Sequence, residues 1–365
     1  MPDLFTPITV GPYTLPNRVF MAPCTRCRAD ADLAQGPLNA LYYAQRAGAG
    51  LIITEATQIS QAGIGYPGTP GIHTEKQVAG WKLVTDAVHA KGGRVFAQLW
   101  HCGRVSHHAF QPGGGAPLSS SATTKPGLVT LPDYSKVPYP TAKEMTVDDI
   151  RATMADYRHA AECAMRAGFD GVELHGANGY LPDQFLRDGV NRRTDTYGGS
   201  IENRARFHIE ATRALAEVWG ASRVGVRLSP SGTFGDVRDS DPKATFGYVV
   251  KTLGAMGLAY LHIMEAMEGD GRNDGKPIEG YESIPASYFR PMFKGTLITN
   301  AGFTKEKAET YIRVGWADAV AFGVAFIANP DLPERFRRGA ALNTPDPATF
   351  YTPGEKGYTD YPFLG

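Results

Sequence analysis

Short apolar runs of strand length alternate with longer amphipathic stretches along most of this chain. The apolar runs predict eight β-strands, at residues 18–22, 51–55, 94–99, 170–174, 223–228, 260–265, 296–300 and 318–322. The amphipathic stretches predict eight helices, at residues 37–47, 75–91, 147–167, 201–219, 242–256, 285–293, 305–314 and 330–338. Strands that alternate with helices in this way predict an α/β fold, a (β/α)8 TIM barrel, and we expect residues 1–365 to form a single domain.

Two of the predicted helices begin with a capping box, one at Thr74 and Gln77 and the other at Thr146 and Asp149. In this motif the threonine hydroxyl accepts from a backbone N–H that has no partner within the helix. A doubly wound sheet is the competing fold, and it would carry a glycine-rich dinucleotide fingerprint after its first strand. The turn after residues 18–22 reads Pro-Cys-Thr-Arg instead, so the barrel is favoured.

Two segments are expected as additions to the barrel. Residues 8–15 predict a short hairpin ahead of the first strand, and we expect it to plug the bottom of the barrel. Residues 103–145, after the third strand, are rich in Gly, Pro, Ser and Thr. Because they are too long for an ordinary connection, we expect them to form a lid over the catalytic face.

The charge of the chain is balanced, with 37 Lys plus Arg residues and 37 Asp plus Glu residues among 365. Because the chain has no excess of basic residues, we do not expect nucleic acid or anionic membranes as partners. No apolar stretch is long enough to span a bilayer, and the N-terminus lacks a signal-peptide pattern. Four cysteines in a chain of this length do not form a disulfide framework, so a cytoplasmic protein is expected. Monomer and homodimer both stay open.

Polar side chains recur where the predicted strands end. In a barrel the carboxyl ends of all strands face one cavity. These positions hold Thr25, Ala56, Gln98, Trp100, His175, Asn178, Tyr180, Arg227, Asn300, Gly302 and Gly323. The glycines follow strands seven and eight, where barrels commonly bind phosphate through backbone amides. The pattern indicates a cofactor with a phosphate tail, a hydrogen-bonding ring and an edge stabilised by a cation.

The run from His175 to Tyr180, after the fourth strand, holds most of the candidate chemistry. His175 and Asn178 can donate hydrogen bonds, and Tyr180 is a weak acid. Donors that hold an oxygen beside a proton source suit a reaction that builds negative charge on a carbonyl or nitro group. On these residues alone, the alternative is a turn whose His and Tyr side chains fill the edge of the core.

Ordered motifs extend along nearly the whole chain. They are Leu4-Phe5-x-Pro7, Asn17-Arg18, Tyr42-Tyr43-Ala44-Gln45-Arg46, Gln98-Leu99-Trp100-His101, Tyr197-Gly198-Gly199-Ser200-x-Glu202-Asn203-Arg204, Asn329-Pro330-Asp331-Leu332 and Gly357-Tyr358-Thr359-Asp360-Tyr361-Pro362. With these motifs the chain resembles the old yellow enzyme family of FMN-dependent ene-reductases, in its classical branch. The resemblance implies FMN as bound cofactor, NADPH or NADH as hydride donor, and small-molecule activated alkenes as substrates.

The resemblance also assigns cofactor-binding residues, which are Pro23, Cys24, Thr25, Ala56, Gln98, His175, Arg227, Asn300, Gly302, Gly323 and Val324. Thr25 matches the residue beside the O4–N5 edge of the flavin, and Gln98 matches the residue at its pyrimidine edge. Arg227 matches the cation near N1–O2, where negative charge collects when the ring is reduced. Gly302 and Gly323 match the phosphate-binding turns.

The same resemblance assigns the catalytic groups. His175 and Asn178 match the pair that holds the carbonyl or nitro oxygen of the substrate, and Tyr180 matches the proton donor. Tyr66, Trp100 and Tyr351 match residues of the substrate pocket. The implied activity is that of an NADPH dehydrogenase or alkene reductase: hydride passes from flavin N5 to the C=C bond, and Tyr180 protonates the neighbouring carbon.

Two features of the sequence depart from the family pattern. After Gly323 the family usually places an arginine on the FMN phosphate, but this chain has Val324. A charge-assisted hydrogen bond contributes about 1.5–3 kcal/mol, so we expect FMN to bind but to dissociate more readily. The spacing of Cys24 and Cys27 would allow a redox or metal role. Because no second Cys or His pair completes a zinc site, we interpret both as structural and expect no metal.

Two other functions stay open from the residues alone. A non-redox barrel, such as a lyase or isomerase that acts on a phosphorylated substrate, would use the same phosphate turns. Such an enzyme would need a lysine or a carboxylate base at a strand end. A flavin-binding protein without turnover would fit the loss of the arginine at Val324. The presence of His175, Asn178 and Tyr180 argues against that second alternative.

Overall fold

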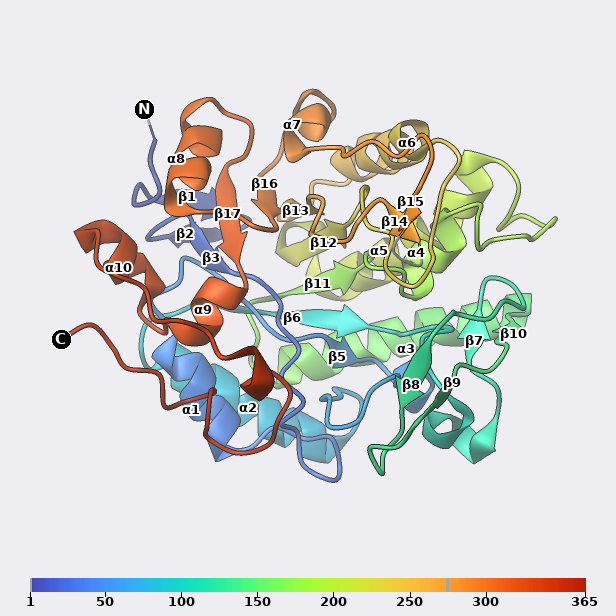
Figure 1. The fold of residues 1–365 in the computed structure, drawn as a ribbon, viewed down its shortest axis with the longest axis horizontal. Helices are drawn as coiled ribbons and strands as arrows, with labels where there is room; N and C mark the ends of the chain where they lie inside the picture. The colour runs from blue at the N-terminus through green and yellow to red at the C-terminus, as the bar shows by residue number, and fades with distance from the viewer. Residues whose placement is uncertain (1, 274–275) are drawn as a thin grey trace.

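Eight parallel strands close into a ring in this computed structural model, which describes residues 2–273 and 276–365 (Figure 1). They are β3 (Val19–Met21), β4 (Ile52–Ile53), β6 (Val95–Trp100), β11 (Gly171–His175), β12 (Val224–Leu228), β13 (Tyr260–Met264), β16 (Leu297–Asn300) and β17 (Ala319–Phe322). Each strand pairs in parallel with the next, and β17 pairs with β3 to complete the circle. The predicted TIM barrel is therefore confirmed, and each predicted strand overlaps an observed one.

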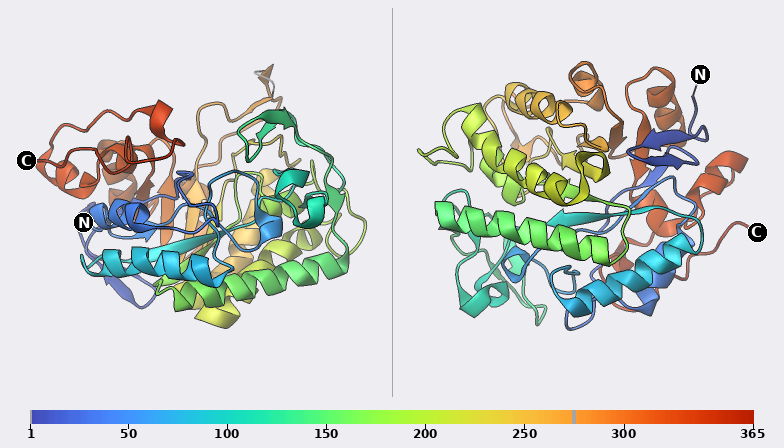
Figure 2. Two further views of the ribbon diagram at one scale, coloured as in Figure 1. Left: turned by 90° about the horizontal axis from the view of Figure 1, so that it is seen from below. Right: turned by 180° about the vertical axis from the view of Figure 1, so that it is seen from behind.

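Helices surround the strands, and the long helices α2, α3 and α5 lie along one side of the barrel (Figure 2). The helices that overlap predicted ones are α1 (Pro37–Gln45), α2 (Glu75–His89), α3 (Val147–Arg166), α5 (Ile201–Trp219), α6 (Pro242–Gly254), α7 (Ala286–Phe289), α8 (Lys305–Arg313) and α10 (Leu332–Arg338). The capping boxes at Thr74 and Thr146 form as predicted. Over the part of the chain that the structure describes, no helix could cross a membrane.

The helix predicted at residues 285–293 was wrong in length. Only α7 is α-helical, and a 3-10 turn follows at Arg290–Met292. Pro291 lies in that turn, and proline has no backbone N–H to continue an α-helix. Two short helices were not predicted, α4 (Leu181–Leu186) and α9 (Val324–Ala328). All six residues of α4 are buried, so that helix has no polar face from which a helical period could be read.

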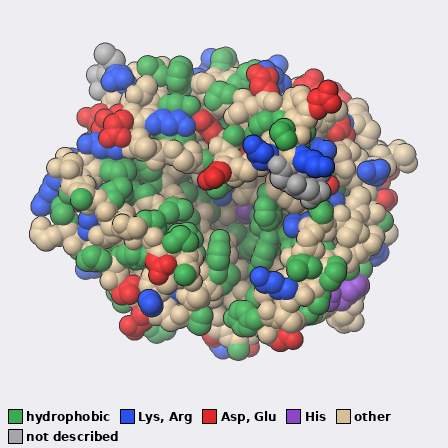
Figure 3. Space-filling view, in the orientation of Figure 1, with side chains coloured by type: hydrophobic (Ala, Val, Ile, Leu, Met, Phe, Trp, Pro, Cys, Tyr) green, Lys and Arg blue, Asp and Glu red, His purple; other side chains and the backbone are tan. Residues whose placement is uncertain are grey.

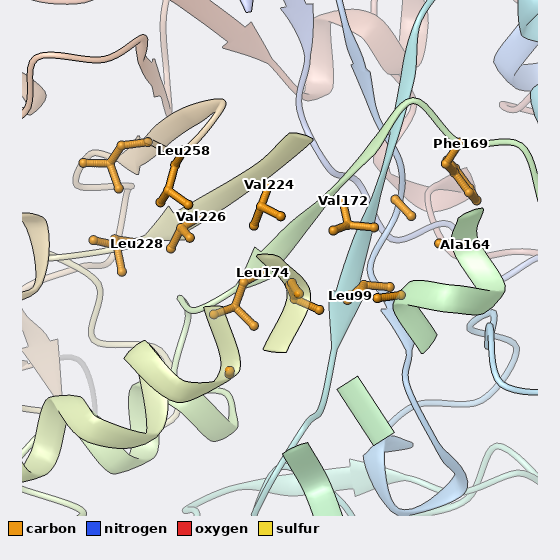
Figure 4. Close-up of a cluster of buried hydrophobic side chains, with 14 of the residues drawn as sticks. Leu99, Ala164, Phe169, Val172, Leu174, Val224, Val226, Leu228 and Leu258 are labelled. Atoms are coloured by element: carbon orange, nitrogen blue, oxygen red, sulfur yellow. The ribbon is translucent and has the colours of Figure 1, made fainter. Parts of the chain in front are cut away.

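Apolar side chains alternate with other residues along the barrel strands. Val172 and Leu174 of β11 belong to the main buried cluster, together with Val224 and Val226 of β12 and side chains of the outer helices (Figure 4). Because side chains of a strand point alternately to opposite faces, Glu173 between Val172 and Leu174 faces the inside of the barrel. The main core thus lies between strands and helices, whereas Glu173 lies inside the barrel together with a smaller apolar cluster that includes Phe20, Phe96 and Tyr260.

The remaining strands belong to the additions. The antiparallel hairpin β1 (Ile8–Val10) and β2 (Tyr13–Leu15) forms as predicted, and Val10 and Leu15 share a buried cluster with Phe20, Phe96 and Tyr260 of the barrel. Its function as a plug stays a prediction.

The segment after β6 forms the second addition. The last residues of β6 pair with β5 (Thr57–Gln58). Residues 103–145 then form β7 (Leu118–Ser119), β8 (Leu128–Thr130), β9 (Lys136–Pro138) and β10 (Lys143–Glu144). Two short strands that pair antiparallel, β14 (Arg272–Asn273) and β15 (Lys276–Pro277), follow β13. The lid function of residues 103–145 also stays a prediction.

Candidate active site

A cavity of about 720 Å³ opens at the carboxyl ends of the barrel strands. Six of the residues predicted for the site line it: Thr25, Tyr66, Trp100, Asn178, Tyr180 and Tyr351. Segments far apart in the sequence supply the rest of the wall, including Thr130, Tyr134, Phe234, Met264, Met267, Glu268 and Asp270. Figure 3 shows this face hollowed near its centre, with hydrophobic side chains on the walls and a histidine visible inside. The barrel therefore brings the predicted strand ends to one concave site.

The turn between β11 and α4 places two of the candidate groups. Asn178 and Gly179 both have positive φ, at 56° and 70°, a conformation that asparagine and glycine tolerate better than other residues. The backbone N–H of Asn178 donates to Ser229 Oγ at 2.8 Å, and that of Gly179 donates to Asp183 Oδ2 at 2.9 Å. These bonds hold the left-handed turn, so Asn178 and Tyr180 both reach the cavity wall.

Four rings pack together beside the cavity. Tyr180 packs edge-on against Trp100 and against His175, in each case with ring centroids 4.9 Å apart. Tyr66 stacks on Trp100 at 5.5 Å, and its hydroxyl lies 3.2 Å from the Tyr180 hydroxyl. Packing on several sides restricts the rotation of the Tyr180 ring, so its phenol oxygen keeps one position at the cavity wall.

Burial determines which of these groups carry protons. It raises the pKa of Tyr180 far above its ordinary value, so the phenol stays protonated over the whole neutral range. Burial also lowers the pKa of His175 well below its ordinary value, and the positive charge of Arg227 acts in the same direction. His175 is therefore neutral, a hydrogen-bonding group without a charge, and Tyr180 is the group that holds a proton.

Buried polar atoms without partners mark the interior side of the site. Gln98 Oε1, Arg227 Nε and Asn300 Oδ1 each lack a hydrogen-bond partner among residues 2–273 and 276–365. His175 Nδ1 and Asn178 Oδ1 are also buried and lack a hydrogen-bond partner within those ranges. Buried polar atoms are nearly always paired, so a set of donors and acceptors in this state at the strand ends fits a polar ligand. A ring that carries both donors and acceptors matches this set.

The segments after β3 and β4 form another part of the same site. Pro23, Cys24 and Thr25 are half-buried, and Ala56 is buried with 3% of its surface exposed. Burial raises the pKa of both Cys24 and Cys27, to about 12 for Cys27, so both are protonated thiols and not reactive thiolates. Cys27 lines the cavity, which the structural interpretation of this cysteine did not anticipate.

The predicted phosphate turns lie on neighbouring strands, because Asn300 of β16 pairs with Ala321 of β17. Gly302 is exposed and has a φ of 64°, and Gly323 directly precedes α9. A side chain at Gly323 would come within 3.1 Å of Cys24 Sγ, so the loops after β17 and β3 meet closely. Val324 is 51% exposed and offers no charge to a phosphate.

Comparison with known proteins settles the family. Residues 3–343 match the NADH:flavin oxidoreductase / NADH oxidase family. The chain belongs to the old yellow enzyme family.

Several members of the old yellow enzyme family match this chain over almost its whole length. It is 47% identical over 366 residues to 12-oxophytodienoate reductase 1 of Oryza sativa subsp. japonica, covering 99% of this chain and 93% of that protein. The structure of morphinone reductase superposes with a TM-score of 0.92 at 51% identity, covering 100% and 96% of the two chains. The old yellow enzyme homologue of Zymomonas mobilis gives a TM-score of 0.94 at 44% identity, covering 100% of both.

Two residues that sequence reasoning missed, Glu173 and His262, form a buried network with the predicted site residue Gln98. Glu173 accepts from Gln98 Nε2 at 2.7 Å and lies 2.9 Å from His262 Nδ1, and both Glu173 and His262 are fully buried. The only signal for Glu173 in the sequence was a carboxylate inside the apolar run 170–174, a residue type that is almost never buried without partners.

The segment that carries Tyr351 is also held by residues the sequence analysis missed. Arg28, 9% exposed, donates to four backbone carbonyls of the C-terminal segment, those of Thr349, Phe350, Gly354 and Lys356. Arg26 donates to two carbonyls of the same segment, Phe350 and Gly357. The stretch that contains Thr25 and Cys27 therefore also ties down the segment with Tyr351.

Proposed function

We propose that this protein is an FMN-dependent ene-reductase, which uses NADPH or NADH to reduce the C=C bond of α,β-unsaturated carbonyl or nitro compounds. One observation carries the proposal. A protonated phenol and a carboxamide line a cavity, a neutral imidazole packs against that phenol, and Gln98, Arg227 and Asn300 hold buried polar atoms without partners within the described residues. Membership of a flavin oxidoreductase family supports the redox chemistry and argues against a lyase or isomerase.

Gln98, Arg227 and Asn300 are the residues that would hold the flavin ring, together with the backbone of residues 23–25. Their free buried atoms support this assignment. Gly302, Gly323 and Val324 would hold the phosphate through backbone amides. When bound, FMN supplies a hydride acceptor and donor at N5, the chemistry that side chains lack.

His175 and Asn178 would hold the substrate oxygen, on which negative charge grows as the alkene is reduced. Neutral donors in a site of low polarity stabilise such charge well, because they are already oriented when the charge develops. Tyr180 would then donate its phenolic proton to the carbon next to the carbonyl or nitro group. Its raised pKa keeps that proton on the phenol until a strongly basic centre forms.

The hydride donor would enter the same cavity before the alkene does. A structure of morphinone reductase, 51% identical to this chain with a TM-score of 0.92, is in complex with tetrahydroNAD. That relative supports a nicotinamide nucleotide as the donor. Both the donor and the alkene need the ring face, so each would have to leave before the other binds.

An anaerobic titration tests the proposal. The purified protein should show the visible absorption of bound flavin, NADPH or NADH should bleach it, and an α,β-unsaturated ketone should restore it. A colourless protein that takes up no FMN would overturn the proposal. A flavin that is bleached but not restored by any activated alkene would favour the flavin-binding protein without turnover.

A further inference from the structure

Glu173 connects two groups of the barrel interior. It lies on β11 directly opposite Gln98 of β6, and its Oε1 accepts from Gln98 Nε2 at 2.7 Å. Its Oε2 lies 2.9 Å from Nδ1 of His262 on β13. Glu173 and His262 have no exposed surface, and Gln98 has 1%. Three strands are thus joined by one carboxylate at the depth of the predicted ring site.

The contact with Glu173 fixes the direction of the Gln98 amide. Glu173 Oε1 accepts from Gln98 Nε2, so the NH2 side of the amide faces the carboxylate. Oε1 of Gln98 must therefore point elsewhere, and it is buried with no partner within residues 2–273 and 276–365. Gln98 Oε1 is thus a hydrogen-bond acceptor with a fixed direction, which suits the imide N–H of a flavin ring.

Glu173 also balances charge at the neighbouring strand. Arg227 on β12 is 5% exposed, and its Nη2 contacts the sulfur of Met264 at 3.4 Å. Burial lowers the pKa of Arg227, and the charge of Glu173 acts against that shift more than any other group. Cys24, Tyr260 and Tyr180 act on the pKa of Arg227 in the same direction as Glu173 but less strongly. The charge of Arg227 in turn acts on the imidazoles of His175 and His262. Glu173 pairs with Gly225 on the neighbouring strand, two residues before Arg227, so its charge lies on the adjacent strand and offsets part of the cost of burying the guanidinium.

We propose that Glu173 is a positioning residue of the flavin site, which orients the Gln98 acceptor toward the ring and offsets part of the charge of Arg227. The inference rests on the proposed function. Glu173 touches neither the substrate nor the ring, and it acts through Gln98 and Arg227. It has two separable effects: the amide orientation determines how tightly oxidised FMN binds, and the charge determines how strongly the reduced, anionic ring is favoured.

Glu173→Gln removes the charge and keeps the size of the side chain. We expect FMN to bind at least several-fold more weakly, since the Gln98 amide is no longer held in one orientation. We also expect the ratio of reduced to oxidised FMN affinity to rise about tenfold, a positive shift of about 30 mV for a two-electron couple. Equilibrium dialysis and anaerobic redox titration with a reference dye measure the two quantities.

Asp170→Asn is the matched control. Asp170 is a buried carboxylate one residue before β11, at the opposite end of the barrel, where it pairs with Arg94 and accepts from the backbone N–H of Val95. Its replacement should lower the stability but leave the flavin potential unchanged. An equal shift of potential in both variants would overturn the inference, because the effect would then be a general loss of charge or packing.

Glu173→Asp separates the two effects and serves if the glutamine variant does not fold. Aspartate keeps the charge but is one methylene too short to reach Gln98 and His262 as glutamate does. FMN should bind more weakly while the potential stays near that of the wild type, and FMN affinity equal to that of the wild type would overturn the positioning role. A wild-type protein that binds no FMN would instead refute the proposed function, before any variant is compared.

Discussion

The phenol oxygen of Tyr180 lies 3.2 Å from the phenol oxygen of Tyr66, at the wall of the cavity. Either hydroxyl can be the donor in this pair. When Tyr66 donates, the proton of Tyr180 is free to point into the cavity, and the hydrogen bond stabilises the phenolate that forms after that proton has left. The two tyrosines thus have different expected effects on proton transfer, although they belong to one pair.

Tyr180→Phe removes the acid and keeps the ring packing. Flavin reduction by NADPH should keep its rate, whereas reoxidation by an enone that needs protonation at carbon should slow by roughly 10²–10⁴. Anaerobic stopped-flow measurement of each half-reaction checks this. Tyr66→Phe, which leaves the proton of Tyr180 in place, should slow reoxidation much less. Equal slowing in both variants would show that Tyr180 is not the acid.

Val324→Arg should strengthen FMN binding. Val324 is 51% exposed at the start of α9, next to the predicted phosphate turn, and an arginine there would add a charge-assisted hydrogen bond. The FMN dissociation constant should fall roughly 10- to 150-fold. Val314→Arg, at a valine 50% exposed at the end of α8, is the control for added charge alone. The same gain in both variants, or none in Val324→Arg, would contradict the prediction.

Arg28→Lys should loosen the C-terminal segment that carries Tyr351. Lysine has no planar group to serve four carbonyls at once, so the free energy of unfolding should fall by about 1–3 kcal/mol. The KM for the alkene should rise while kcat changes little, since the wall of the cavity moves but the reacting groups do not. Steady-state kinetics and urea unfolding measure both effects.

Arg335→Lys is the control for the Arg28 variant. Arg335 is also buried and also donates to C-terminal carbonyls, those of Ala341 and Pro362, but it lies away from Tyr351. Stability should fall in the same way, with the KM unchanged. A raised KM in the Arg335 variant would mean that general loosening, and not the position of Tyr351, controls substrate binding.

His101 should make the protein less stable in mild acid. Burial lowers its pKa to about 3, and its Nδ1 accepts from the backbone N–H of Gly103 at 3.0 Å. Below about pH 6.5, His101 binds a proton in the unfolded chain but stays neutral in the folded protein. The free energy of unfolding therefore falls by about 1.4 kcal/mol per pH unit, until the pH reaches the pKa of His101 in the folded state.

His101→Asn isolates this effect, because asparagine keeps an acceptor for Gly103 but has no titrating ring. Between pH 6.5 and pH 5 the wild type should lose about 2 kcal/mol relative to the variant, as measured by urea unfolding. Buried carboxyls such as Glu55 and Asp183, whose pKa values burial raises, act in the opposite direction. They are present in both proteins and cancel in the difference. A constant difference across this pH range would contradict the prediction.

Local pattern was enough to predict the barrel and the position of its site. Strand-length apolar runs and the capping threonines Thr74 and Thr146 depend on neighbours a few residues away, so their elements could be read along the chain. The carboxyl ends of parallel strands meet by necessity in a barrel, and so the gathering of Asn178, Tyr180 and Trp100 at one cavity followed from their places alone.

Only the tertiary structure determined the contacts between residues that are distant in the sequence. Gln98 and Glu173 are 75 positions apart, and Arg28 and Thr349 are 321 apart, so no local pattern relates them. The short helices α4 and α9 likewise owe their conformation to packing rather than to an amphipathic period. The protonation of His175 and Tyr180 belongs to this second class, since burial, which shifts both pKa values, exists only once the chain has folded around them.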